Sequence, residues 1–136
     1  MSASALLRLD EQLDSEDAGA ALAAAWDVFD MITKLAHSIT FDEGSDELQA
    51  MIVSQQCSEG RDRLPLPETS LLVTAPPPEP GAAGLAPYVR LLEHVSAVLT
   101  RLSAGEVADA ASARALVEVG ELASGAAVAL SFVRGQ

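Results

Sequence analysis

Groups that commonly carry chemistry are scarce in this sequence. It has one cysteine (Cys57), two histidines (His37 and His94), one lysine (Lys34) and only 4% aromatic residues. A single cysteine excludes an internal disulfide, which fits a reducing cytoplasm. The chain also lacks Cys-x-x-Cys, His-Glu-x-x-His, Gly-x-Ser-x-Gly and a phosphate-binding glycine loop. The sequence therefore predicts no catalytic residue, no cofactor and no metal site.

Long apolar runs are also missing. The most apolar stretch, 115–133, is interrupted by Glu118 and Glu121, which disfavours a membrane span. The first residues lack the apolar segment of a secretory signal and become acidic at Asp10. We therefore expect a cytoplasmic protein with no membrane partner.

Basic residues are too few to balance the acids. The net charge is −12, and residues 1–47 hold eleven acids against Arg8 and Lys34. Phosphate backbones and anionic membranes should be repelled by this third of the chain, so nucleic acid is not an expected partner. The acids are explained by solubility alone; the alternatives are a docking face for a basic partner or a nucleic-acid mimic.

Alanine takes the place of the missing large residues, with 25 among 136 positions. Alanine is the best helix former, and a core of Ala, Leu and Val lets helices pack closely. The composition thus favours helices packed on helices. Seven arginines beside one lysine, together with the alanine content, indicate a GC-rich bacterial genome.

The apolar spacing predicts helices over about 2–13, 15–39, 45–63, 87–105 and 109–133. Ser15 and Ser45 are the expected N-caps of the second and third helices, and Pro87 suits the first turn of the fourth. Residues at 3–4 spacing form the expected core stripes: Leu22, Ala25, Phe29, Ile32, Ala36 and Ile39; Ala50, Val53, Cys57, Gly60 and Leu64; Tyr88, Leu91, Val95, Val98 and Leu102; Leu116, Val119, Ala123, Ala126, Leu130 and Val133. Asp27, Asp30 and Lys34 should lie opposite the stripe of the second helix.

Six of the seven prolines fall within 65–84. Proline cannot continue a helix, so an internal proline-rich linker is predicted over 65–86. The prediction is an all-α fold: one domain, 1–136, forming a bundle of four main helices plus a short N-terminal helix. The linker joins its two helical hairpins.

Cys57 allows two interpretations. Its place in an apolar stripe predicts a buried packing residue, since free cysteine is among the most buried residue types. Arg61 and Arg63 follow within six residues and would favour a reactive thiolate. No histidine lies near Cys57 in sequence to act as a base, so packing is the favoured interpretation.

A second candidate site is formed by Arg90, His94 and Arg101 on the fourth helix. Together these side chains could bind an anion. The favoured alternative is that they form a solvated rim and pair with acids of the N-terminal third.

Some apolar residues fall outside the core stripes. Phe132 and Val128 lie off the stripe of the fifth helix, and Leu48 and Ile52 off that of the third, so all four are candidates to face a partner. They favour a non-catalytic protein–protein interaction module, expected as a homodimer or in a larger complex. The alternative is a small-molecule binder or enzyme with a pocket near Trp26, Cys57, Tyr88 and His94.

Overall fold

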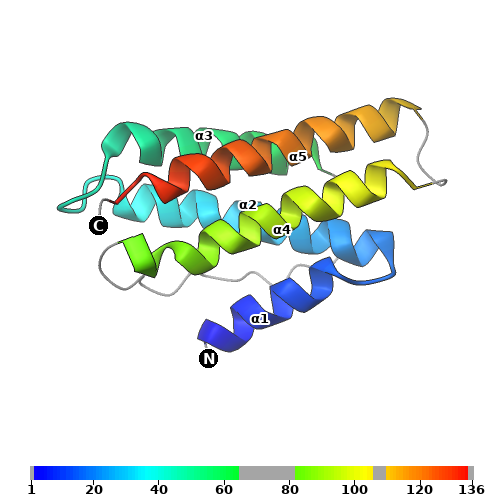
Figure 1. Cartoon of the computed structure of the whole chain (residues 1–136), viewed down its shortest axis with the longest axis horizontal. Helices are drawn as coiled ribbons and strands as arrows, with labels where there is room; N and C mark the ends of the chain where they lie inside the picture. The colour runs from blue at the N-terminus through cyan, green and yellow to red at the C-terminus, as the bar shows by residue number, and fades with distance from the viewer. Residues whose placement is uncertain (1, 65–81, 106–109, 135–136) are drawn as a thin grey trace.

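The computed structural model describes residues 2–64, 82–105 and 110–134 (Figure 1). They form five α-helices and a single 3-10 turn, with these bounds: α1 Ser2–Leu13, α2 Ala18–Ile39, α3 Glu47–Arg63, η1 Ala82–Gly84, α4 Ala86–Ser103 and α5 Ala110–Ser131. The predicted all-α fold of four main helices and a short N-terminal helix is confirmed. Across these ranges no helix is both long enough and apolar enough to span a bilayer.

Helices α2 to α5 form the bundle, and α1 lies along α2 and α4 (Figure 1). Around the bundle the neighbours are α2 with α3, α3 with α5, α5 with α4, and α4 with α2. Each of these neighbouring pairs is antiparallel (Figure 1). Helix α3 therefore ends at the opposite end of the bundle from the start of α4.

The linker predicted over 65–86 lies largely outside the described residues, which omit 65–81. Its last residues are ordered differently from the prediction, because η1 occupies Ala82–Gly84 and α4 already begins at Ala86. Leu85 between them is buried. Pro87 stands in the first turn of α4 as predicted.

Aspartates cap α2 and α3, not the predicted serines Ser15 and Ser45. The carboxylate of Asp17 accepts from the Gly19 N–H at 3.0 Å, and that of Asp46 accepts from the Gln49 N–H at 3.1 Å. Aspartate is as good an N-cap residue as serine. Asp17 and Asp46 also lie closer to the first apolar turn of their helices than Ser15 and Ser45 do. The hydroxyl of Ser15 instead accepts from the backbone N–H of Asp17.

A short turn connects α2 to α3 and contains Gly44. Its φ is +84°, a left-handed conformation that side chains with a Cβ rarely adopt. The backbone N–H of Asp46 then donates to the carbonyl of Val133 at 2.6 Å. This contact joins the start of α3 to the end of α5, so these two segments share one end of the bundle.

The core follows the four predicted stripes. Every stripe residue is buried except Leu22, Leu102 and Leu116, which are partly buried against the core. On the side of α2 opposite its stripe, Lys34 is exposed, but Asp27 and Asp30 are buried. The cause is the position of α2, which packs against α1, α3 and α4 and so has little free surface.

Candidate functional site

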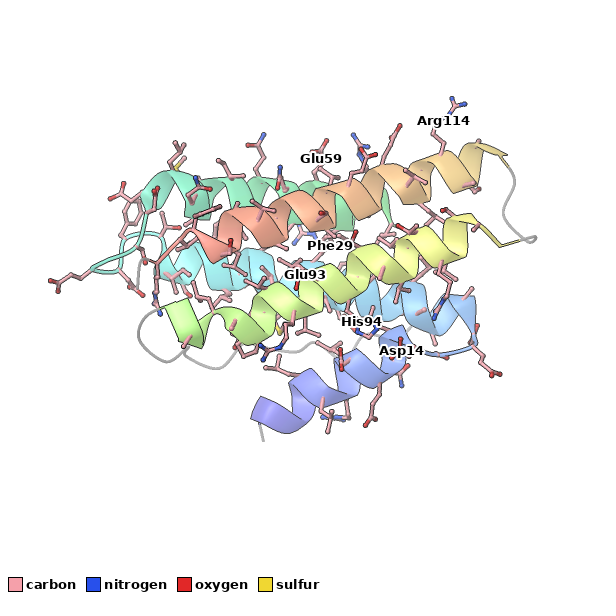
Figure 2. The ribbon with its side chains drawn as sticks, in the orientation of Figure 1. Asp14, Phe29, Glu59, Glu93, His94 and Arg114 are labelled. Carbon is pink, nitrogen blue, oxygen red and sulfur yellow. The ribbon has the colours of Figure 1, made fainter. Side chains whose placement is uncertain are left out.

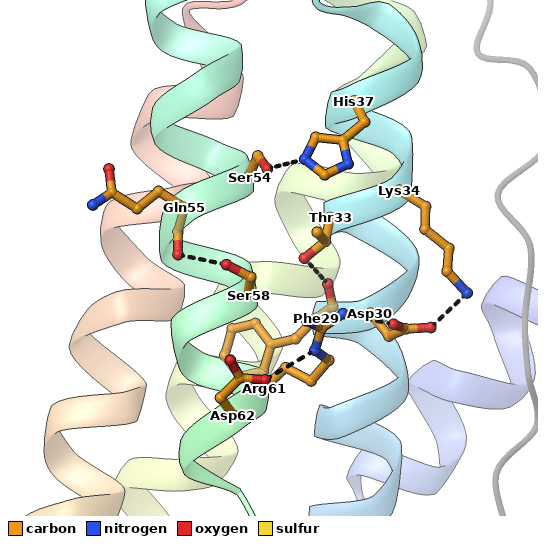
Figure 3. A network of polar contacts seen from close by, with 10 residues as sticks. All are labelled: Phe29, Asp30, Thr33, Lys34, His37, Ser54, Gln55, Ser58, Arg61 and Asp62. Atoms are coloured by element: carbon orange, nitrogen blue, oxygen red, sulfur yellow. Dashed lines mark hydrogen bonds and ion pairs between the residues drawn. The ribbon is translucent and has the colours of Figure 1, made fainter.

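A groove runs between the end of α2 and the start of α3. It has a volume of about 510 Å³ and is lined by His37, Thr40, Phe41, Met51, Ser54 and Gln55. Phe41, directly after α2, has an exposed fraction of 82%, and Met51 on α3 has one of 59%. The His37 Nε2 atom meets the Ser54 hydroxyl at 2.5 Å and joins the two helices (Figure 3). The groove is therefore lined by the apolar side chains of Phe41 and Met51 and by a polar contact between its two helices.

A second apolar surface adjoins the groove on the outer side of α3 and α5. Leu48, Val128 and Phe132 have exposed fractions of 65%, 57% and 64%. Leu48 lies about 160° around α3 from the buried Ala50, so it points away from the core. The contact between Asp46 and Val133 brings Leu48 and Phe132 to the same end of the bundle.

The structure thus leaves three of the four predicted partner-facing residues exposed: Leu48, Val128 and Phe132. Ile52 is half-buried and packs against the core. Ile52 is covered because it lies on the side of α3 that faces α5. Gln56, four residues further along the same side, lies against Gly125 of α5.

Phe41 and Met51 were not predicted from the sequence to face a partner. Phe41 stands in the turn after α2, outside every helical stripe, so periodicity gives it no role. Met51 follows Leu48 by three residues, and that i, i+3 spacing was the available signal. We call the five exposed residues the apolar end surface: Phe41, Leu48, Met51, Val128 and Phe132.

Acidic residues border this surface. Asp42, Glu43, Asp46 and Glu47 all lie in the turn between α2 and α3 or at the first position of α3. Arg134 pairs with Asp42 at 3.5 Å, and Asp46 is the α3 cap. Among the described residues, neither Glu43 nor Glu47 pairs with a cation. The same end of the bundle therefore carries both exposed apolar side chains and acidic residues.

A polar network links α2 and α3 further along. The Asp30 carboxylate accepts from the Arg61 Nη1 atom and from the Lys34 Nζ atom, each at 2.9 Å (Figure 3). The Asp30 side chain is 12% exposed and that of Arg61 is 26% exposed. This mostly buried pair joins Arg61 of α3 to Asp30 of α2.

Cys57 is fully buried, as its stripe predicts. Burial raises the pKa of its thiol from 9.0 to about 12. A thiol with that pKa is almost entirely protonated at neutral pH, so the thiolate required of a nucleophile is absent. The burial supports the interpretation of Cys57 as a packing residue.

The predicted anion-binding group is placed at the contact of α4 with α1. His94 lies between two carboxylates: Nδ1 meets Asp10 at 2.6 Å and Nε2 meets Asp14 at 2.7 Å. Figure 2 shows His94 of α4 beside Asp14 at the end of α1. Arg101 donates to the carbonyl of Leu13 at 3.4 Å. Two of the three residues thus contact the N-terminal third of the chain.

Arg90, the third member, is exposed beside a separate groove between α1 and α4. That groove has a volume of about 300 Å³ and is lined by Leu6, Leu7, Asp10, Pro87, Arg90 and Leu91. Burial lowers the pKa of His94, but hydrogen bonds to Asp14 and Asp10 and the charges of both carboxylates raise it above the ordinary 6.5. An imidazolium satisfies both carboxylates, because each ring nitrogen then carries a proton to donate.

The residues of the alternative pocket are spread over three helices. Trp26 on α2 is half-buried, while Cys57 on α3 and Tyr88 on α4 are buried. Neither groove described above is lined by any of them or by His94. Within the described ranges, no three His, Cys, Asp or Glu side chains are grouped so as to hold a metal ion.

Comparison with known proteins adds no functional information: no protein-family model, no curated protein and no solved structure matches the chain.

Proposed function

We propose that this protein is a non-catalytic protein–protein interaction module of a bacterial cytoplasm, acting as an accessory subunit, adaptor, specialised chaperone or regulator. The observation that carries the proposal is the apolar end surface. Scattered single apolar residues are normal on protein surfaces, but a contiguous group bordered by charge is typical of an interface. Here α3, the end of α5 and the turn after α2 bring Phe41, Leu48, Met51, Val128 and Phe132 to the same end of the bundle.

The chemistry of the surface also suits protein recognition. Aromatic residues and methionine are enriched at the centres of interfaces, while charged residues are enriched at their edges. Phe41, Met51 and Phe132 supply the first class, and Glu43 and Glu47 supply the second. Displacing water from these exposed side chains would drive association.

The test is native mass spectrometry of the tagged chain purified gently from the bacterial cells that make it. A Leu48→Ser, Phe132→Ser variant is compared with a Leu7→Ser, Val117→Ser variant, which alters two exposed apolar residues elsewhere. We expect a stoichiometric protein complex that the first variant loses and the second retains. A monomer carrying a small molecule in all three proteins would support the alternative, a small-molecule binder, and overturn the proposal.

A further inference from the structure

We infer that the groove between α2 and α3 binds one amphipathic helix of a protein partner. This inference rests on the proposed interaction function. The apolar row of that helix enters the groove, and its flanking residues are lysine or arginine. The inference names a partner by its chemistry: apolar on one face and basic beside it.

The shape of the site argues for a helix. The groove is lined by the end of α2, the turn after it and about one turn of the antiparallel helix α3, and Phe41 and Met51 are exposed in its walls. An amphipathic helix presents apolar side chains at i, i+3, i+4 and i+7, which form a row able to lie along such a groove. Met51 adds adaptability, because methionine repacks readily against different side chains.

The extent of the apolar surface argues against a small ligand as the main occupant. Leu48 lies one helical turn from Met51 on α3, and Phe132 lies at the same end of the bundle. The exposed apolar surface thus continues from the groove over the outer side of α3. A helix seated in the groove would be wide enough to cover its walls and part of this outer side.

The acidic residues near the groove indicate which residues should flank the apolar row of the partner helix. Within 42–47 there are four acids, and the nearby cations are already engaged, Arg134 with Asp42 and Lys34 with Asp30. Within the described part of the chain, Glu43 and Glu47 form no ion pair, so they are able to pair with incoming cations. A basic partner gains from them, and its association is accelerated by steering.

The acidic residues near the groove disfavour nucleic acid, an anionic membrane or a second copy of the chain as its occupant. Nucleic acid and anionic membranes are repelled by this edge. A second copy carries the same acids and the same net charge of −12, so self-association must overcome repulsion between the two chains. A basic helix meets neither obstacle.

The test uses three labelled peptides of about 15 residues, long enough to form a helix. One has Leu at helical spacing with Lys elsewhere, the second replaces each Lys by Glu, and the third has the composition of the first without an apolar face. Fluorescence anisotropy measures their binding to the full chain. We expect saturable binding of the first peptide only, weakening as salt increases.

Paired variants localise the binding. Phe41→Ser with Met51→Ser should weaken it about tenfold or more, the loss of two anchors, whereas Leu7→Ser with Val117→Ser should leave it within about twofold. Glu43→Gln with Glu47→Gln should weaken it about threefold to tenfold at low salt and flatten the salt dependence. Glu93→Gln with Glu121→Gln makes the same change in net charge on other exposed residues and should have little effect.

Three outcomes overturn the inference: no binding of the basic amphipathic peptide, equal binding of the acidic or scrambled peptide, or equal weakening by the control variants. The last result would mean diffuse attraction to an acidic protein. A fourth outcome, self-association in sedimentation velocity that Phe41→Ser with Met51→Ser abolishes, would also overturn the inference, because a second copy would then be the occupant. In each case the native complex lost through Leu48→Ser with Phe132→Ser would still support the interaction module, so the two proposals fail separately.

Discussion

The ring of Phe29 lies against the backbone of Gly60, where α2 meets α3. A Cβ added at Gly60 would stand 2.8 Å from the Phe29 Cζ atom and 3.0 Å from both Cε atoms. Phe29 is fully buried, so its ring has no free space into which to move. Gly60 is therefore the residue that lets this aromatic ring fit between the two helices.

Gly60→Ala should destabilise the protein by about 1–3 kcal/mol through overpacking. The direction of this change in stability identifies its cause, because a Gly→Ala substitution in an unobstructed helix stabilises the helix by about 0.5–1 kcal/mol. Urea unfolding measures the difference, with Gly19→Ala in the exposed first turn of α2 as the control. Adding Phe29→Leu to Gly60→Ala should recover part of the loss in a double-mutant cycle. A Gly60→Ala protein as stable as the wild type would show that the contact is not tight.

The pair Asp30–Arg61 predicts a second unfolding result. Arg61→Met should cost about 2 kcal/mol, because it leaves the mostly buried Asp30 carboxylate with only Lys34. Lys34→Met removes the other cation, but the Lys34 side chain is 64% exposed, so the loss should be about 0.5 kcal/mol or less. Equal losses of stability in the two variants would mean that burial does not make the ion pair of Asp30 with Arg61 stronger than its ion pair with Lys34.

Periodicity was enough to predict the core of the outer helices. On α4 and α5 one face packs and the other meets solvent, so a 3–4 stripe predicts burial well. The same logic did not predict the burial of Asp27 and Asp30, because α2 is buried on more than its stripe: 13 of its 22 residues are buried, against 6 of the 18 in α4. Sequence spacing gives the preferred face of one helix but not the number of its neighbours.

The candidate site was predictable only in part. Leu48, Val128 and Phe132 break the stripes of their helices, which is visible in the sequence. That these residues share one end with Phe41 depends on the α2–α3 turn and on the contact of Asp46 with Val133, which joins segments far apart in the chain. Acids of the N-terminal third were the predicted partners of His94, but the spacing could not identify Asp10 and Asp14, which lie 84 and 80 residues away in sequence.

Cys57 should be unreactive in the folded protein. Its buried thiol has a pKa of about 12, so at pH 8 its thiolate fraction is about 1,000-fold below that of a thiol with a pKa of 9.0. Labelling with an aromatic disulfide reagent should be at least about 100-fold slower in buffer than in concentrated urea. Similar rates in the two solutions would show that Cys57 is accessible, contrary to its burial.

The docking of α1 should depend on pH through His94. The folded-state pKa of His94 is raised by Asp14 and Asp10 despite the opposing effect of burial. Stability from the protonated ring is therefore fully present below the unfolded pKa of about 6.5 and is lost as pH rises through the higher folded-state pKa. Because both carboxylates are more than half exposed, we expect this contribution to be about 1 kcal/mol.

Amide hydrogen exchange of α1 is the direct measurement, corrected for the intrinsic pH dependence of exchange. Protection at the buried Leu9 and Leu13 should be lower at about pH 9 than at about pH 5.5, as the imidazolium loses its proton. His94→Gln should remove most of this difference, since glutamine cannot carry the charge. His37→Gln is the matched control, because the ring of His37 contacts the Ser54 hydroxyl and not a carboxylate. A His94→Gln protein that kept the full pH dependence would place its origin in another group and leave α1 held by Leu9 and Leu13 alone.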